Sequence, residues 1–189
     1  MRKLILSMQI SLDGFAEGEN GDMSWMKTND EEQWEDIFEL LKTVDLFLLG
    51  RSMWPDYRDY WKLALTNKSA SASERAYAEL AEKTPHIIFS RTIQDSGWHN
   101  KLINHGPVAE EVKKLKLQPG KNIEIVGGPQ LANSLIEAGL VDEYRLVVNP
   151  IILSKGKSLF HGMTIRSKLQ LQEAKALKSG IVILRYVTA

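Results

Sequence analysis

Two short segments pair an arginine with the small residues of a strand end, a combination suited to binding phosphate. Gly50-Arg51-Ser52 follows one apolar run and Ser90-Arg91 follows another. A glycine lets the chain turn tightly, and a guanidinium holds phosphate oxygens through charge-assisted hydrogen bonds. We expect a short helix from Arg51 to about Tyr57, whose first N–H groups would add to the first site. A solvated arginine after a strand is the alternative at both places.

The third and strongest segment is Gly127-Gly128-Pro129-Gln130-Leu131, between a predicted strand and a predicted helix. Two glycines allow the backbone to approach a ligand closely, and the start of a helix directs N–H groups at its phosphates. The alternative is a tight strand-to-helix turn, although one glycine would usually suffice for that. The ordinary dinucleotide fingerprint G-x-G-x-x-G is absent.

Other chemistries are disfavoured. Gly156-Lys157-Ser158 resembles the end of a phosphate loop, but Ile151 stands where that motif needs its first glycine. The four histidines lack metal-ligand spacing, no serine lies in a G-x-S-x-G turn, and there is no cysteine. We therefore expect no metal site, no serine hydrolase and no disulfide scaffold.

The composition is that of one ordinary globular domain, which we expect to span residues 1–189. Hydrophobic residues make up 43% and charged residues 25% of the chain. Lys+Arg and Asp+Glu are both 24, so no net charge favours nucleic acid or an anionic membrane as a partner. The short apolar stretch at residues 1–10 cannot span a membrane and lacks a cleavage site, which predicts a cytoplasmic protein.

The elements that must position these segments alternate between helix and strand. The predicted strands are Lys3–Ile10, Val44–Leu49, Pro85–Ser90 and Asn122–Val126, and the predicted helices are 30–41, Ser71–Lys83, Pro107–Leu117 and Pro129–Ala138. Asp30 stands where a helix N-cap belongs. Such alternation is typical of a parallel sheet with crossover helices, in which ligands bind beyond the carboxyl ends of the strands.

In the last third of the chain, helices and strands no longer alternate. Asp142–Val148, Leu169–Ala176 and Ile181–Val187 are predicted strands without intervening helices, and the last two are joined as a hairpin around Lys178-Ser179-Gly180. Residues 15–29 form a predicted polar loop whose Trp25 and Met26 suggest that it covers something. The predicted fold is α/β, with a mostly parallel central sheet flanked by helices and a C-terminal antiparallel hairpin.

The order of five segments resembles the dihydrofolate reductase superfamily. They are Ser11-Leu12-Asp13-Gly14, Leu48-Leu49-Gly50-Arg51, Phe89-Ser90-Arg91, Gly127-Gly128-Pro129 and Gly139-Leu140-Val141-Asp142-Glu143. The stretch from Gly139 through Asn149-Pro150-Ile151-Ile152 to Gly156-Lys157-Ser158-Leu159-Phe160 is more similar to the C-terminal reductase domain of bifunctional riboflavin-biosynthesis enzymes. The resemblance covers nearly the whole chain.

This resemblance implies NADPH as cofactor. It places Gly50, Arg51 and Ser52 at the cofactor phosphates and Ser90 with Arg91 at the adenosine 2′-phosphate. It places the segment that begins at Gly127-Gly128, a pair often joined by a cis peptide bond, at the pyrophosphate and nicotinamide. It also implies a homodimer, whereas the zinc deaminase domain of the bifunctional enzymes is absent from this chain.

The substrate side is less defined. Dihydrofolate reductases carry a carboxylate on their first helix, and Asp30 or Glu31 lies in the corresponding region, where capping and the helix dipole would also explain them. Asp13 and Trp25 are candidates for binding substrate, although a turn and core packing would also account for them.

We therefore predict a reductase that transfers hydride from NADPH to a small heterocyclic or pentose-derived substrate, as in 5-amino-6-(5-phosphoribosylamino)uracil reduction. Two alternatives are a non-catalytic NADP(H)-binding protein of the same fold and a binder of flavin or another nucleotide.

Overall fold

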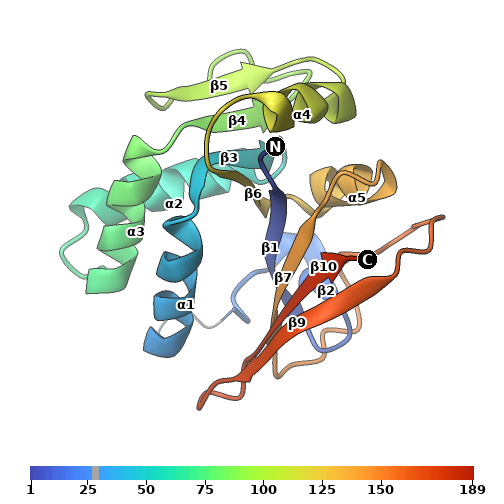
Figure 1. Cartoon of the computed structure of the whole chain (residues 1–189). Helices are drawn as coiled ribbons and strands as arrows, with labels where there is room; N and C mark the ends of the chain where they lie inside the picture. Colours follow the sequence, from blue (N-terminus) through green and yellow to red (C-terminus); the bar gives the residue numbers. More distant parts are fainter. Residues whose placement is uncertain (27–29) are drawn as a thin grey trace.

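A computed structural model describes residues 1–26 and 30–189, and its centre is one eight-stranded sheet (Figure 1). The strands are β1 (Leu4–Ser11), β3 (Val44–Gly50), β4 (His86–Phe89), β5 (Lys101–Asn104), β6 (Asn122–Gly127), β7 (Glu143–Asn149), β9 (Leu169–Ala176) and β10 (Val182–Thr188). Their order across the sheet is β5-β4-β3-β6-β1-β7-β10-β9.

All the strand pairs from β5 across to β7 are parallel, and β10 runs antiparallel to both β7 and β9. The predicted fold class is thereby confirmed. Strand β7, the first of the three strands without intervening helices, still belongs to the parallel part, because it pairs in parallel with β1. Helix α5 (Pro129–Glu137) and the turn after it return the chain to the start of the sheet, as a parallel pair requires.

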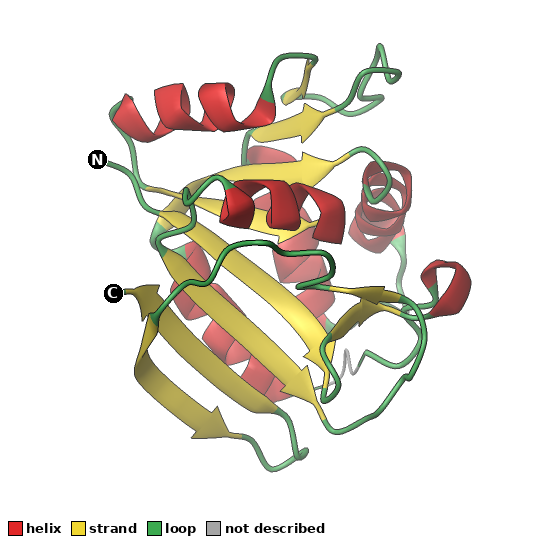
Figure 2. Ribbon diagram, turned by 90° about the vertical axis from the view of Figure 1, so that its right-hand side faces the viewer, coloured by secondary structure: helices red, strands yellow, loops and turns green. Residues whose placement is uncertain are grey.

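Helices cover both faces of the sheet. One face packs against α1 (Glu31–Leu41), α2 (Trp54–Thr66) and α3 (Ala72–Lys83), whose Trp34, Trp54 and Tyr77 join one buried cluster with Phe47 of β3. The other face packs against α4 (Val108–Leu117) and α5, as Figure 2 also shows. Each helix is amphipathic, so burial of its apolar side fixes it on the sheet.

Side-chain caps define where two of these helices begin. Asp30 is the N-cap of α1, and its carboxylate accepts a hydrogen bond from the Gln33 N–H at 3.0 Å. Ser71 and Glu74 form a capping box at the start of α3. The N-cap predicted at Asp30 is therefore confirmed, and such caps stabilise a helix by about 1 kcal/mol.

Some local predictions are wrong. The helix expected from Arg51 to about Tyr57 begins at Trp54 and continues to Thr66, because residues 50–53 are a turn in which the Met53 N–H bonds the Gly50 carbonyl. The polar loop at 15–29 contains strand β2 (Phe15–Glu17) and a 3-10 turn at Glu19–Gly21, while residues 27–29 of that loop lie outside the described residues.

Three strands were not predicted: β2, β5 and β8 (Lys157–Ser158). Strands β2 and β8 pair with each other outside the main sheet, and β5 is its four-residue edge. Each is too short for an alternating pattern to show in the sequence. Within the described residues, no helix is long and apolar enough to cross a membrane.

Candidate functional site

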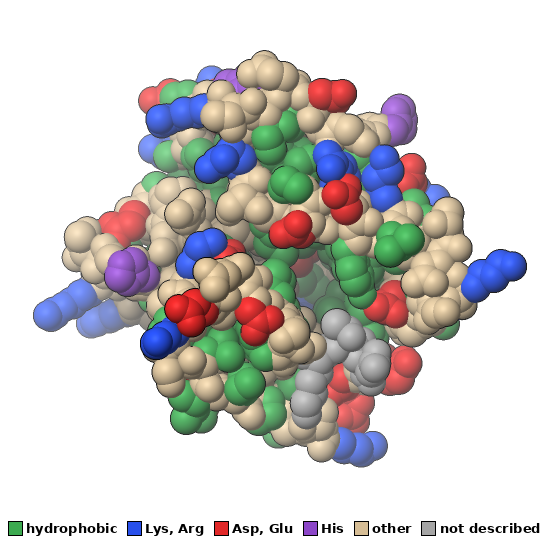
Figure 3. Space-filling model, turned by 180° about the vertical axis from the view of Figure 1, so that it is seen from behind, with side chains coloured by type: hydrophobic (Ala, Val, Ile, Leu, Met, Phe, Trp, Pro, Cys, Tyr) green, Lys and Arg blue, Asp and Glu red, His purple; other side chains and the backbone are tan. Residues whose placement is uncertain are grey.

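The carboxyl ends of the parallel strands meet along one side of the molecule. In Figure 2 the strands run from left to right, and Figure 3 looks onto the side where they end. That surface is hollowed near its centre, between hydrophobic and acidic side chains. Because β4, β3 and β6 are neighbours in the sheet, the three phosphate-binding segments predicted from the sequence follow adjacent strands.

Gly50 and Gly128 bring two of these segments into backbone contact. A Cβ atom on Gly128 would lie 3.2 Å from both the Cα and the backbone nitrogen of Gly50. Gly128 also has φ +96°, in the region that favours glycine. On Gly127 a Cβ atom would overlap the Met53 sulfur. The glycines therefore serve the close approach of the β3 and β6 turns.

The helix N-terminus predicted at this point is present. Gly128 is the N-cap of α5, Pro129 is in its first turn, and no side chain caps its N–H groups. Gln130 is exposed there, whereas Leu131 is buried in the core. Uncapped N–H groups at the start of a helix can bind an anion. All peptide bonds among the described residues are trans, so the cis bond expected at Gly127-Gly128 is not found; Gly128 turns the chain through its positive φ instead.

The two arginines lie at the ends of β3 and β4. Arg51 and Ser52 are exposed in the turn that precedes α2, and Arg91 is exposed beyond β4. Neither guanidinium pairs with a carboxylate of residues 1–26 or 30–189. Both are therefore available to a negatively charged ligand.

Ser90 has a structural role that the sequence did not reveal. Its hydroxyl accepts hydrogen bonds from the N–H groups of Thr92 and Ile93, at 3.2 and 2.9 Å, and its carbonyl lies 2.6 Å from Nδ1 of His105. These contacts fix the turn that carries Arg91. The prediction that Ser90 contacts the cofactor stays a prediction.

The carboxylates predicted to take part in catalysis or binding accept hydrogen bonds from other groups of the protein. Glu31 is exposed at the start of α1 and accepts a hydrogen bond from the Ser73 hydroxyl at 3.3 Å. Asp13 accepts hydrogen bonds from Ser11 Oγ at 2.6 Å and from the N–H groups of Leu153 and Ser154, at 3.1 and 2.8 Å, which lower its pKa. Asp13 therefore ties the turn after β1 to the segment after β7.

Asp30 and Trp25 also have local partners. Asp30 caps α1, as described above. The Trp25 indole N–H donates to the Asp22 carbonyl at 3.0 Å, within the loop that follows β2. The catalytic and substrate-binding roles of Asp13, Trp25, Asp30 and Glu31 stay predictions.

Strand β1 carries polar residues that the sequence analysis missed. Its Leu4, Leu6, Met8 and Ile10 are buried on the face that packs against α4 and α5. Of the residues between them, Ile5 is buried in the cluster under α1, but Ser7 and Gln9 are half-buried. Polar residues at every second position of an otherwise apolar strand are the signal that could have identified this side of the sheet.

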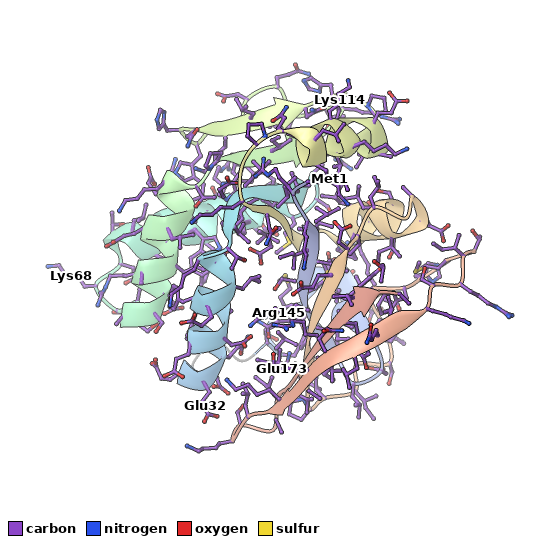
Figure 4. The ribbon with its side chains drawn as sticks, viewed as in Figure 1. Met1, Glu32, Lys68, Lys114, Arg145 and Glu173 are labelled. Atoms are coloured by element: carbon purple, nitrogen blue, oxygen red, sulfur yellow. The ribbon has the colours of Figure 1, made fainter. Side chains whose placement is uncertain are left out.

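Ser7 begins a polar row across four strands. It pairs in register with Arg145 of β7, which pairs with Arg185 of β10, which pairs with Glu173 of β9. Figure 4 shows Arg145 between α1 and these strands. Its guanidinium forms an ion pair with the Asp36 carboxylate and donates to the Asp36 carbonyl at 2.8 Å. Burial, and secondarily the Arg185 charge, lowers the pKa of Arg145 to about 10.

Near the carboxyl end of this face, buried amides have unused acceptor atoms. Asn149 donates to the Gln9 side chain at 3.1 Å, but its Oδ1 atom has no partner among the described residues. Gln33, on the first turn of α1, likewise has an unpartnered Oε1 atom. These side chains are only 1% and 4% exposed. Unsatisfied buried acceptors are costly, so they favour a ligand with N–H or O–H groups.

One buried carboxyl lies on the same face. Glu124 of β6 is 6% exposed and pairs in register with Ile5 and Phe47. Burial raises its pKa to about 8, and a hydrogen bond with Ser7 opposes this shift. Its Oε2 atom has no partner among the described residues.

A second buried polar group lies deeper under the helices. The hydroxyl of Tyr57 is 3.3 Å from that of Tyr77 and 3.2 Å from Nε2 of His86. Burial, followed by the charge of Lys101, lowers the pKa of His86 to about 3, so this imidazole is neutral. Within the described residues, no group of three or more His, Cys, Asp or Glu side chains could hold a metal ion.

The arrangement thus offers two surfaces on one sheet. The glycine-rich turns and the start of α5 suit the phosphates of a nucleotide, and the polar face between α1 and the sheet suits a small polar molecule. A nucleotide and a second reactant held at adjacent surfaces can react with each other.

Known proteins share both the sequence pattern and the fold. A family model described as the RibD C-terminal domain matches residues 2–183. An uncharacterized protein of Bacillus subtilis (strain 168), YyaP, is 33% identical over 185 residues, which are 98% of this chain and 94% of that protein.

Two solved structures illustrate the fold. The deaminase/5-amino-6-(5-phosphoribosylamino)uracil reductase of Thermotoga maritima superposes with a TM-score of 0.69 at 14% identity, over all of this chain and 57% of that one. A dihydrofolate reductase of Enterococcus faecalis complexed with NADP(H) gives a TM-score of 0.66 at 13% identity, covering 98% and 96% of the two chains. These matches confirm the resemblance predicted from the sequence.

Proposed function

Because the chain belongs to the RibD C-terminal domain family, a family of reductases, we propose that it is an NADPH-dependent reductase. It transfers hydride to a C=N or C=O bond of a small heterocyclic or pentose-derived substrate, as in the reduction of 5-amino-6-(5-phosphoribosylamino)uracil. The observation that carries this proposal is the contact of Gly50 with Gly128 beside the uncapped start of α5.

We assign the cofactor to the carboxyl end of β3, β4 and β6. The N–H groups at the start of α5 would face the pyrophosphate, and the turn at Gly50, Arg51 and Ser52 would close over it. Arg91, held by the Ser90 turn and without a carboxylate partner among the described residues, would bind the 2′-phosphate of NADPH. Bound there, NADPH supplies the hydride, and the protein supplies position and electrostatics.

We assign the substrate to the polar face under α1. The buried acceptor atoms of Gln33 and Asn149 suit the N–H groups of an aminated heterocycle. The Asp36–Arg145 pair links α1 to β7 at the side of that face. This placement supports a heterocyclic substrate in preference to a purely apolar one.

The experiment that tests this function is a parallel titration with NADPH and NADH, followed by nicotinamide fluorescence. NADPH should bind more tightly than NADH. Replacing Arg91 with alanine should weaken NADPH about 10-fold to 100-fold, the loss of one charge-assisted contact, and change NADH little. The matched control is Arg75→Ala, which removes an exposed arginine from α3. It should leave both affinities unchanged.

The outcome of this titration separates the alternatives. If neither nucleotide binds, the proposed function is wrong. If NADPH binds but is not oxidised with any of a pterin, a pyrimidine or a small carbonyl compound, the chain is a non-catalytic NADP(H)-binding protein. An equal effect of Arg91→Ala on NADPH and NADH would contradict the assignment of the 2′-phosphate.

We also propose that the protein is a homodimer and acts in the cytoplasm. Strand β9 is the edge of the sheet, and seven of its eight residues are exposed. An exposed edge can pair with the same strand of a second copy. Sedimentation at micromolar concentration tests this association, and a monomer would contradict it.

A further inference from the structure

Glu124 combines burial with an incomplete set of hydrogen bonds. Its side chain lies on the face of β6 beneath the helices, between Ile5 on one neighbouring strand and Phe47 on the other. The Oε2 atom is buried and has no partner among the described residues. An ionised carboxylate at such a place would be strongly unfavourable, so Glu124 is a carboxylic acid near neutral pH.

Ser7 connects this acid to the half-buried part of the sheet. It lies two residues beyond Ile5, the register partner of Glu124, toward the carboxyl end of β1 and on the same face of the sheet, and its interaction with the Glu124 carboxyl opposes the rise in the pKa of that group. The Ser7 side chain is only half-buried although its strand is central. A serine hydroxyl can accept a proton from one side and donate its own to the other.

Both residues are close in the sheet to the proposed cofactor site. Glu124 is three residues before Gly127 on the same strand, and Val126 is the next residue on the face that Glu124 occupies. β1 lies next to β6 in the sheet, on the side toward β7. A proton leaving Ser7 would therefore reach a substrate bound on the face under α1, next to a cofactor held at the start of α5.

The titratable groups around Glu124 do not favour its ionised form, so the carboxyl group stays protonated. Tyr57 of α2 and Tyr77 of α3 interact with it electrostatically, and burial raises the pKa of both tyrosines, so they are neutral as well. His86 of β4 contacts Tyr57 and is neutral. On the side of β7 and α1, Arg145 lies opposite Ser7 and is paired with Asp36. No cation among the described residues offsets the burial of Glu124.

We propose that Ser7 and Glu124 form a proton relay to the substrate, with Ser7 as the residue that touches it. This inference rests on the proposed function. In the step, the hydride of NADPH adds to the carbon of the C=N or C=O bond, and the nitrogen or oxygen takes a proton from Ser7 Oγ. Ser7 takes the Glu124 proton, NADPH becomes NADP⁺, and the carboxylate regains a proton from water after product leaves.

Two variants and a control test the relay. Glu124→Gln keeps the shape and removes the acidic proton, and Ser7→Ala removes the connecting hydroxyl. Tyr77→Phe removes a buried hydroxyl near Glu124 without changing either member of the relay. NADPH affinity should be unchanged in all three variants.

The first readout does not require turnover. The infrared difference spectrum between wild type and Glu124→Gln near neutral pH should contain the C=O band of a protonated carboxyl group, which disappears in alkaline solution. Ser7→Ala should shift the frequency of that band because it removes the hydrogen bond. Absence of the band would overturn the relay, because Glu124 would then have no proton to give.

The second readout is single-turnover NADPH oxidation with 5-amino-6-(5-phosphoribosylamino)uracil, a dihydropterin and a small aldehyde. Both relay variants should lower the rate by about 100-fold or more, the usual contribution of a general acid. The wild-type rate should fall above the pKa of Glu124, and Glu124→Gln should lose that dependence. Tyr77→Phe should retain the wild-type rate and pH profile.

Each result decides between the proposals. NADPH binding and oxidation with the same rate and pH profile in wild type and Glu124→Gln would overturn the relay alone. The same holds if Asp30→Asn abolishes turnover while Glu124→Gln does not, because the proton source would then be the one predicted on α1. Failure of the wild type to bind NADPH would overturn the proposed function and the relay together, and binding without oxidation would overturn the relay and leave only cofactor binding.

Discussion

Replacing Glu124 with glutamine should stabilise the protein in alkaline solution and change its stability little in acid. Burial raises the pKa of Glu124 from 4.5 to about 8 in the folded chain. Its protonated form is the one that the folded state favours. The stability associated with this preference is complete below the unfolded pKa and is lost as the pH rises through the folded pKa.

The size of the effect follows from the difference between the two pKa values. Each pH unit between 4.5 and 8 costs the wild type about 1.4 kcal/mol of folding free energy, or about 4 to 5 kcal/mol in total. Glutamine has no proton to lose, and its amide fits the same volume. The free energy of unfolding of the variant should therefore exceed that of the wild type by this amount above about pH 8.

The assay is urea unfolding, followed by the fluorescence of the five tryptophans, at several pH values from about pH 5 to about pH 9. His86, with a pKa of about 3, destabilises both proteins equally as the pH falls, so the difference between them isolates Glu124. Glu137→Gln, at an exposed carboxylate that accepts hydrogen bonds from Thr164, is the control. Its difference from wild type should be constant over this range.

One result would refute the reasoning. If the unfolding free energies of Glu124→Gln and wild type differ by the same amount at every pH, Glu124 has an ordinary pKa in the folded protein. Burial of Glu124 would then have no effect on its protonation.

Three further substitutions test the geometry of the site and the elements that hold it. Gly128→Ala should weaken NADPH binding and destabilise the fold by about 1 to 3 kcal/mol, because φ +96° and a 3.2 Å contact with Gly50 both oppose a Cβ atom; Gly139→Ala, at φ +65° in open space, shares the strain alone and should retain NADPH affinity. Asp36→Ala should cost about 3 to 5 kcal/mol in urea unfolding, because it leaves Arg145 buried and unpaired, and a loss below 1 kcal/mol would contradict this. Asp30→Ala should cost about 1 kcal/mol through the lost N-cap, and an undiminished thermal midpoint would show that the cap is dispensable.

The sequence was sufficient for the fold class because local patterns and topology agree. Apolar runs that end in glycine, followed by capped amphipathic helices, dictate crossover units and hence a parallel sheet. The C-terminal hairpin was predictable from Lys178-Ser179-Gly180 between two alternating strands. Short strands such as β2 and β8 were not, because a pair of two- and three-residue strands exists only when both segments meet.

The segments of the proposed nucleotide site were also largely visible in the sequence. Glycines and arginines immediately after strands can be recognised as site candidates from their position alone. The reason is that the carboxyl ends of all parallel strands lie at the same edge of the sheet. The mutual contact of Gly50 and Gly128 required the sheet order, which places β3 beside β6 although these two glycines are far apart in the chain.

The sequence by itself therefore determined the class of fold, the family and the glycine- and arginine-containing segments at the carboxyl edge of the sheet. Only the tertiary structure decided which polar residues face one another under α1. Ser7, Glu124 and Arg145 come from three strands, and their register and burial arise when the sheet is assembled. A glutamate in a strand is ordinary until its neighbours exclude water, and that exclusion is a property of the packed molecule.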